Sequence, residues 1–284
     1  MSLIHETSQT TRRNPQTQAV RMLALDMDGT SLNREGQLAE DSIRALGEAR
    51  RLGWTICFVT GRTRVDIAPL GDTWRVAQYL ILNNGGKTIR AADDALVGRY
   101  LVDPADAEKT INHCIINKLQ LYVLGDDAWW LNVVTPRDRQ YIAHTGSEPI
   151  LLRDVSQVPL DKVEGFMSLR DWSAVWEWVE KSGTGLEVFN SEPECVDILP
   201  SGVTKWNALL ALADSLGAKP ENIIAMGNYH NDLDMIQGAG VGIAVPSAPD
   251  EIKHIANYVT TKDYDDGAVS EVVARYVLPD STGR

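Results

Sequence analysis

Two aspartates stand one residue apart directly after an apolar run near the start of the chain. The run covers residues 20–25 and is followed by Asp26-Met27-Asp28-Gly29-Thr30. An apolar run that ends in a polar, glycine-containing cluster predicts a buried parallel strand that stops at an active-site edge. Two neighbouring carboxylates repel each other, and partial desolvation adds to that cost unless a cation or proton offsets it. The pattern therefore indicates a chemical site at the carboxyl end of this strand, where open α/β sheets bind ligands.

Two further apolar runs end in the same way. Residues 55–59 lead into Thr60-Gly61-Arg62, and residues 79–82 lead into a cluster of two asparagines and two glycines at 83–86. Between the first two runs, residues 43–52 have helical periodicity, and Gly53 stands where a helix-ending C′ glycine belongs. Strand and helix thus alternate, and we expect the polar strand ends to share one edge of a parallel sheet.

The middle of the chain has a different pattern. Between residues 87 and 199 the apolar residues alternate with polar ones, as in half-exposed antiparallel strands. Two helices are expected, one over residues 104–118 and one carrying the apolar stripe Trp172, Val175, Trp176 and Val179. This part is predicted to be a separate α+β module.

The last part returns to strand and helix alternation. We expect a helix from about Lys205 within residues 203–216, a strand at 222–226, and short strands at 241–245 and 258–260. The predicted fold class is α/β, with a Rossmann-like parallel-sheet core built from residues 19–86 and 200–284. Residues 87–199 are assigned to an inserted cap, and residues 1–18 to a flexible tail.

Composition narrows the range of partners. The 284 residues include 27 basic and 39 acidic ones, for a formal net charge of −12. This balance argues against nucleic acid or an anionic membrane as a partner, whereas a local cation still allows a small anionic substrate. The three cysteines form no CxxC pair, and no apolar stretch reaches the length of a membrane span, so a cytoplasmic protein is expected.

Six segments, in this order, resemble the haloacid dehalogenase superfamily, and specifically its Cof-like phosphatases with a C2B-type cap. The resemblance extends from Arg21 to Val277. The matching segments are Asp26-Met-Asp-Gly-Thr30, Val59-Thr-Gly-Arg62, Asn83-Asn-Gly-Gly86, Pro200-Ser-Gly-Val-Thr-Lys205, Gly227-Asn-Tyr-His-Asn-Asp232 and Asp265-Asp-Gly-Ala268.

The resemblance implies roles for individual residues. Asp26 would be the nucleophile that forms an aspartyl-phosphate, and Asp28 the general acid and base. Thr60 would bind the phosphate and Lys205 would neutralise charge in the transition state. Further contacts to substrate or phosphate are expected from Met27, Gly29, Gly61, Arg62, Asn84 and Asn231.

The resemblance also implies Mg²⁺ as cofactor, held by Asp26, Asp28, Asn228 and Asp232. Asn228 departs from the family pattern, in which an acidic residue commonly stands at this position. An amide oxygen still ligates Mg²⁺ but carries no charge, so weaker metal binding is expected. Asp232 retains the second acid and would hold either a metal-bound water or the Lys205 ammonium.

For several of these residues, a purely structural role is the alternative to a role in the site. Arg62 either reaches the substrate or forms a surface pair, and Asn231 has a helix N-cap as its alternative. Trp129 and Trp130 are adjacent on a predicted strand, so one should face the cap core and the other the opposite face. Asp197 could meet substrate, although charged strand positions usually face water.

The leading hypothesis is a Mg²⁺-dependent phosphatase of small phosphorylated metabolites, with sugar phosphates favoured, acting as a monomer or weak homodimer. The first alternative is a phosphomutase of similar fold, which returns the phosphoryl group to a sugar. The second is a metabolite-binding or regulatory protein that kept the fold and lost the chemistry. Only the neutral Asn228 supports this second alternative.

Overall fold

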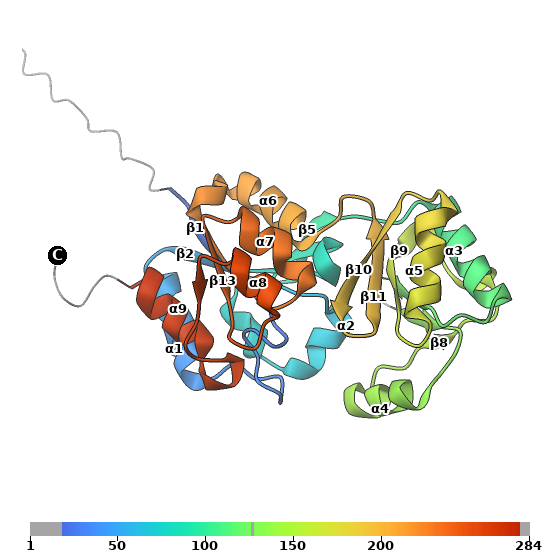
Figure 1. Ribbon diagram of the computed structural model, residues 1–284, viewed down its shortest axis with the longest axis horizontal. Helices are drawn as coiled ribbons and strands as arrows, with labels where there is room; N and C mark the ends of the chain where they lie inside the picture. The colour runs from blue at the N-terminus through green and yellow to red at the C-terminus, as the bar shows by residue number, and fades with distance from the viewer. Residues whose placement is uncertain (1–18, 126–127, 279–284) are drawn as a thin grey trace, which may run out of the picture.

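The computed structural model describes residues 19–125 and 128–278, which form two sheets with helices packed on them (Figure 1). The predicted tail, residues 1–18, lies outside the described residues. In spatial order the core sheet contains β14 (Tyr258–Val259), β13 (Val241–Ala244), β12 (Ile223–Gly227), β1 (Arg21–Leu25), β2 (Trp54–Val59), β3 (Tyr79–Leu82), β4 (Lys87–Arg90) and β5 (Ala95–Arg99).

The strands from β14 to β3 pair in parallel, as the continuous apolar runs predict for strands covered on both faces. The helices of the core are α1 (Glu40–Arg51), α2 (Arg64–Ile67), α6 (Lys205–Leu216), α7 (Leu233–Gly238), α8 (Asp250–Ile255) and α9 (Ala268–Tyr276). Residues of α1, α8 and α9 enter one hydrophobic cluster, and residues of α6 enter another with different strand residues. Helices therefore cover both faces of the parallel sheet, which confirms the predicted fold class.

The second sheet belongs to the cap. Its spatial order is β10 (Leu186–Glu192), β11 (Cys195–Pro200), β9 (Val163–Ser168), β6 (Tyr122–Gly125), β7 (Trp129–Leu131) and β8 (Ile150–Leu151). Its pairs are antiparallel apart from β7 with β8. The helices α3 (Pro104–Ile116) and α5 (Trp172–Ser182) pack on one face of this sheet, and the hydrophobic cluster on its other face contains Tyr122 and Leu131.

Sheet membership places the first domain boundary later than the sequence pattern does. Residues 87–99 were expected to begin the cap, but β4 and β5 extend the core sheet as an antiparallel hairpin next to β3. The alternating pattern of these residues is therefore that of an edge hairpin, a common addition to a largely parallel sheet. The chain enters the cap through residues 100–103 and returns through the segment after β11.

One helix of the cap was not predicted. The helix α4 (Pro136–Thr145) begins with a capping box, in which Thr135 and Asp138 each bond the other's backbone N–H. Pro136 occupies the first helical position, where its missing N–H is not needed. The helix is mostly polar, so hydrophobic periodicity gave no signal. Within the described residues, no helix is long and apolar enough to cross a membrane.

Candidate active site

The polar strand ends meet at one edge of the core sheet, as predicted. Leu25 of β1 lies in register with Phe58 of β2 and Met226 of β12, so the residues that follow these strands are neighbours. The Asp26 N–H donates to the Met226 carbonyl at 2.9 Å, and the Thr60 N–H donates to the Ile81 carbonyl at 2.8 Å. A cavity of about 510 Å³ lies between this edge and the cap.

Lys205 joins two carboxylates below the floor of this cavity. Its Nζ lies 2.7 Å from Oδ1 of Asp26 and 2.7 Å from Oδ1 of Asp232, and its side chain is 1% exposed. Lys205 is the first residue of α6, whose N-cap Thr204 accepts a hydrogen bond from the Asn207 N–H. The helix start therefore fixes the backbone of this buried cation, and the two carboxylates offset the unfavourable position of a cation at a helix N-terminus.

The charged groups of this cluster shift one another's pKa values. Burial and the nearby Asp232 charge together raise the pKa of Asp26 to about 7, against the lowering effect of Lys205. The two carboxylates raise the pKa of Lys205 above its usual value although burial opposes this. Lys205 is therefore charged, and the negative charge at Asp26 is only partly compensated by the protein.

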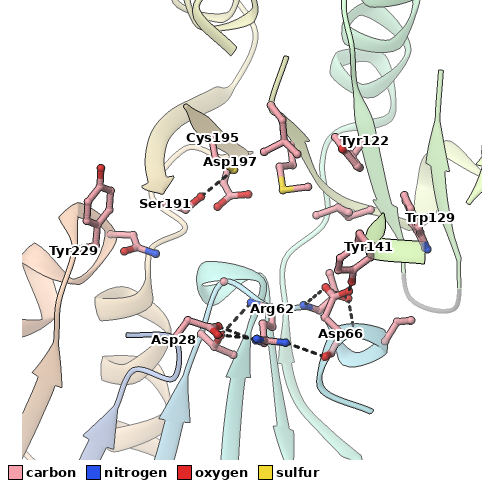
Figure 2. Close-up of a pocket in the computed structure, with 18 of the residues that line it drawn as sticks. Asp28, Arg62, Asp66, Tyr122, Trp129, Tyr141, Ser191, Cys195, Asp197 and Tyr229 are labelled. Atoms are coloured by element: carbon pink, nitrogen blue, oxygen red, sulfur yellow. Dashed lines mark hydrogen bonds and ion pairs between the residues drawn. The ribbon is translucent and has the colours of Figure 1, made fainter. Parts of the chain in front are cut away.

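Asp28 and Arg62 form a bidentate ion pair at the cavity wall (Figure 2). Nε of Arg62 donates to one carboxylate oxygen of Asp28 at 2.7 Å, and Nη2 donates to the other at 2.6 Å. Nη1 donates to the Asp66 carbonyl at 3.2 Å. Of the two alternatives for Arg62, the structure shows ion pairing, but with the residue expected to act as general acid.

Two glycines allow the close packing of the site. Gly29 has φ +66°, and a Cβ there would lie 2.5 Å from Nδ2 of Asn228. A Cβ on Gly227 would lie 2.5 Å from Cγ of Asp232. Any larger side chain would displace Asn228 or Asp232, so these glycines hold the two loops at their observed separation.

A chain of hydrogen bonds connects the core with the cap. Asn231 donates through Nδ2 to Oδ1 of Asn84 at 3.0 Å, and Asn84 donates through Nδ2 to Oδ2 of Asp197 at 2.8 Å. Asn84 has φ +48°, which asparagine tolerates better than most residues. Asp197 on β11 is buried and lines the cavity, so the expectation that it faces water is wrong. Its partner in the core satisfies the buried carboxylate.

The predicted site residues divide into two groups. Asp26, Asp28, Gly29, Thr60, Gly61, Arg62, Asn228 and Asn231 line the cavity. Met27, Asn84, Lys205 and Asp232 are buried at or behind its wall. Residues of the second group can therefore influence a bound ligand only by positioning residues of the first group or through their own backbone atoms.

The expected metal ligands fit Mg²⁺ in part. Asp26, the backbone of Asp28 and the amide of Asn228 offer oxygen donors on residues that line the cavity, and Mg²⁺ prefers oxygen ligands. Burial and the Asp232 charge disfavour the ionised form of Asp26, and a divalent cation bound beside it would stabilise that form. The described residues contain no cluster of three or more His, Cys, Asp or Glu suited to a metal, so an amide and a backbone carbonyl would have to complete this ligand set.

Asp232 has little capacity left for direct ligation. Its Oδ1 accepts from Lys205, and its Oδ2 accepts from the backbone N–H groups of Asn228 and Tyr229 at 2.8 and 3.1 Å. Its side chain has no exposed surface. The arrangement matches the alternative in which Asp232 holds the Lys205 ammonium.

Sequence reasoning missed the cap residues that complete the cavity. Tyr122 and Leu124 come from β6, Met167 from β9, and Arg137 and Tyr141 from α4. The signal that could have revealed α4 is the segment Thr135-Pro-Arg-Asp138, which has the spacing of a capping box with proline at the first helical position. For the strand residues, burial patterns alone do not tell which cap face meets the core.

The parallel core, the inserted cap and the strand-end aspartates define an α/β enzyme whose site lies between core and cap. The sequence model of the haloacid dehalogenase-like hydrolases matches residues 23–273. The chain therefore belongs to this family of hydrolases.

Individual relatives cover almost the whole chain. It is 28% identical over 259 residues to the 5-amino-6-(5-phospho-D-ribitylamino)uracil phosphatase YcsE of Bacillus subtilis, covering 91% of this chain and 96% of the relative. It is 25% identical over 244 residues to the HMP-PP phosphatase of Citrobacter koseri, covering 83% and 89%.

Solved structures share the fold. A haloacid dehalogenase-like hydrolase from B. subtilis superposes with a TM-score of 0.80 at 20% identity, covering 90% of this chain and all of that one. The subclass IIB sugar phosphatase BT4131 superposes with a TM-score of 0.76 at 18% identity, covering 89% and 97%. At these identities the structures support the core-and-cap architecture alone.

Proposed function

We propose that the chain hydrolyses phosphate monoesters of small metabolites through a covalent phosphoryl group on Asp26, with Mg²⁺ as cofactor. The observation that carries this proposal is the buried Asp26–Lys205–Asp232 cluster at the cavity floor. A carboxylate that lines a cavity and is held by a buried ammonium suits nucleophilic attack on an anionic group. Two relatives named as phosphatases support the proposal.

The chemistry follows from the residues at the strand ends. A carboxylate oxygen of Asp26 attacks phosphorus in line, the new O–P bond forms, and the bond to the leaving oxygen breaks. Asp28 gives a proton to that oxygen and then takes one from water, which attacks the phosphorylated Asp26 and releases inorganic phosphate. Lys205 keeps Asp26 oriented in both steps. Bound Mg²⁺ would neutralise charge on the phosphoryl oxygens.

The Asp28–Arg62 ion pair must open in part before Asp28 can transfer a proton. Both oxygens of Asp28 accept hydrogen bonds from Arg62, so Asp28 must release at least one of them to transfer a proton. A bound phosphate offers the guanidinium a second anionic partner. We propose that substrate binding draws one nitrogen of Arg62 toward the phosphate and frees one oxygen of Asp28, while the second nitrogen keeps Asp28 oriented.

The cellular setting is proposed from the cysteines. Cys57 and Cys114 are buried and form no disulfide, and cysteines outside disulfides are typical of a reducing compartment. We propose that the enzyme works in the cytoplasm, as a monomer or weak homodimer.

The test compares Asp26→Asn with Asp72→Asn, a matched change at an exposed aspartate that pairs with Arg75. Asp26→Asn should lower phosphate release by more than about 10³-fold, because the amide is a poor nucleophile. Wild type quenched during turnover should carry a hydroxylamine-sensitive phosphoryl group. Full activity of Asp26→Asn would refute the assignment. Phosphoryl transfer between sugar positions without phosphate release would indicate a mutase.

A further inference from the structure

The cap closes the cavity with a wall of aromatic rings and apolar side chains. The rings of Tyr122 and Trp129 are nearly parallel, with centroids 6.0 Å apart and planes at 15°. Tyr141 meets Trp129 edge-on, with centroids 6.2 Å apart and planes at 83°. Leu124 and Met167 also line the cavity and belong to the same hydrophobic cluster as Tyr122. In Figure 2 the three rings lie together on the cap side, across from Asp28.

The polar atoms of these three rings are bonded to protein groups. The Tyr122 hydroxyl donates to Asp138, and the Tyr141 hydroxyl donates to Asp66 of the core. Nε1 of Trp129 donates to Oγ of Ser147 at 2.9 Å. The donors of the wall are therefore already used within the protein. What the wall offers a ligand is the ring faces and alkyl groups, which match a flat apolar surface better than a polyol.

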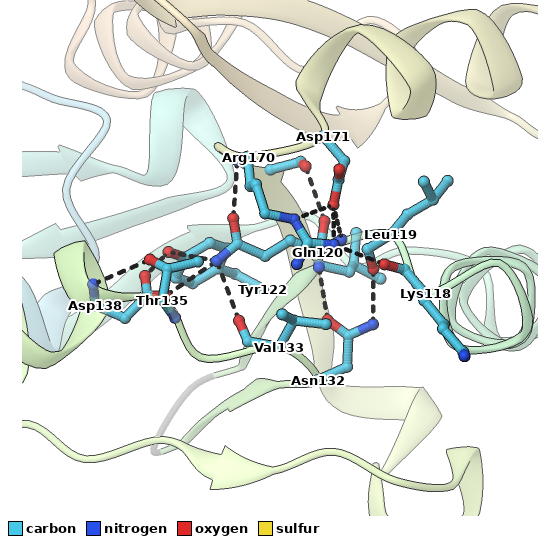
Figure 3. Close-up of polar contacts among 12 residues, drawn as sticks. Lys118, Leu119, Gln120, Tyr122, Asn132, Val133, Thr135, Asp138, Arg170 and Asp171 are labelled. Atoms are coloured by element: carbon cyan, nitrogen blue, oxygen red, sulfur yellow. Dashed lines mark hydrogen bonds and ion pairs between the residues drawn. The ribbon is translucent and has the colours of Figure 1, made fainter.

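A buried polar network holds the wall in place (Figure 3). Gln120 has no exposed surface and donates through Nε2 to Asp138 at 3.0 Å and to the Val133 carbonyl at 3.1 Å. Its backbone N–H donates to Asp171, and its Oε1 accepts from the Arg170 N–H at 2.8 Å. Since Asp138 also binds Tyr122 and caps α4, the network links β6, the segment after β7 and α4. A wall fixed in advance loses little entropy when a ligand binds.

Most of the other lining residues are polar, and they include Arg137 on the cap side; Val65, Ala128, Leu169 and Pro193 are apolar. Asp28 and Arg62 line the cavity from the core, and Ser191, Asp197 and Asn231 also line it. The cavity thus has an ionic end next to Asp26 and an aromatic end in the cap. Its volume of about 510 Å³ exceeds what a phosphate group fills and falls in the usual range for small-molecule sites.

We propose that the leaving group of the substrate carries a planar heteroaromatic ring, which packs against Trp129 and Tyr122 while its phosphate lies at Asp26. The proposal rests on the phosphatase function proposed above and narrows its substrate class. Indole and phenol faces are electron-rich, so they stack favourably on electron-poor nitrogen heterocycles. Trp129 is the specificity-determining residue, because it contacts both other rings of the wall.

The experiment uses substrate pairs that share the phosphate end and differ only in the ring. Uridine 5′-monophosphate is compared with ribose 5-phosphate, and riboflavin 5′-phosphate with ribitol 5-phosphate. Wild type should favour at least one ring-bearing member by about tenfold or more in kcat/KM, in line with the strength of stacking on an aromatic side chain. Equal kcat/KM within both pairs, with phosphate released from all four compounds, would overturn the inference and leave the proposed function intact. No phosphate release from these compounds or from acetyl phosphate would count against the proposed function itself.

Variants at Trp129 then test whether this residue causes the preference for ring-bearing substrates. Trp129→Leu should bring the ratio of the two kcat/KM values within the preferred pair close to one. Trp129→Phe keeps a ring face and should retain most of the preference. Trp176→Leu is the matched control, because Trp176 lies on α5 and bonds Glu180 away from the cavity lining. If Trp129→Leu is folded by circular dichroism and keeps the full ratio, Trp129 does not select the substrate. If that variant does not fold, Trp129→Phe and the wild-type pairs still decide the question.

Discussion

Arg62 binds both carboxylate oxygens of Asp28 through Nε and Nη2, at 2.7 and 2.6 Å. This pair joins the segment after β2 to the loop after β1, and both residues line the cavity. Because a guanidinium is a planar fork, it fixes the plane of the carboxylate as well as its position. The orientation of the proposed general acid therefore depends on Arg62.

Replacing Arg62 by lysine should lower kcat by about ten- to a hundredfold, because a single ammonium leaves Asp28 free to rotate and small misplacements of catalytic groups are costly. Steady-state phosphate release at saturating substrate measures the effect. Arg64→Lys is the matched control, since Arg64 pairs with Asp94 at 2.8 Å and does not line the cavity. Equal kcat for both variants would mean that the Arg62 pair has no part in catalysis.

The core and the residues at its edge could be predicted from the sequence because local signals specify them. The parallel strands β1, β2, β3 and β12 are largely apolar runs, and the polar segment after each of them has to appear at the carboxyl edge of the parallel sheet. Gly53 has φ +83°, as expected of a residue that ends α1. Trp130 belongs to the cap core, whereas Trp129 lines the cavity, as their alternation on a strand predicts.

The remaining features depend on tertiary contacts that no local pattern specifies. The Asp28–Arg62 pair joins residues 34 apart in the chain, and the bond between Tyr141 and Asp66 joins residues 75 apart. Asp197 is an ordinary charged residue in sequence and becomes a buried one only because Asn84 of the core meets it. Which cap face covers the cavity follows from how the two sheets pack, so the aromatic wall could not be predicted.

Lys205 should be essential for stability as well as for the proposed chemistry. Lys205→Met leaves Asp26 and Asp232 buried without their cation, and we expect the free energy of unfolding to fall by about 3–5 kcal/mol. Urea unfolding at pH 8 measures it, since Asp26 of the wild type, with a pKa of about 7, is mostly ionised at that pH and the ion pair that the variant loses is formed. Lys219→Met, at an exposed lysine, should change stability by less than about 0.5 kcal/mol.

A second change separates the charge effect from lost packing. Adding Asp232→Asn to Lys205→Met removes one of the two unpaired charges and should recover part of the lost stability. A double variant less stable than Lys205→Met would show that packing around the lysine chain dominates.

Glu271 should make the free energy of unfolding depend on pH in the acidic range. On α9 it accepts from the Tyr258 hydroxyl at 2.6 Å and from the N–H groups of Thr261 and Lys262, each at 2.9 Å. Although burial opposes it, these hydrogen bonds lower the pKa of Glu271 to about 2. The stabilisation is therefore complete above the unfolded-state pKa, near 4.5, and is lost as the pH falls from there toward 2.

Glu271→Gln tests this dependence. At pH 7 it should lower the free energy of unfolding by about 1 kcal/mol, a value reduced for the partial exposure of the site. Urea unfolding at pH 7, 5 and 3 should show the difference from wild type shrinking at the lowest pH. Glu221→Gln, at an exposed glutamate, should show no such trend. A difference that is constant with pH would mean that the charge of Glu271 is unimportant.

Asn228 sets the charge available to the proposed metal. Asn228→Asp would add a carboxylate beside Asp26 and Asp28 on the cavity wall, so Mg²⁺ should bind about tenfold more tightly or better. Without metal the added charge repels its neighbours, so the apo protein should unfold at a lower temperature than wild type and gain more from added Mg²⁺. Isothermal titration and thermal unfolding with and without Mg²⁺ measure both effects independently of turnover.

Asn222→Asp, at the opposite end of β12, is the matched control and should leave Mg²⁺ affinity unchanged. Unaltered Mg²⁺ affinity in Asn228→Asp would place the metal away from this residue and leave Asp26 and the Asp28 backbone as its expected ligands.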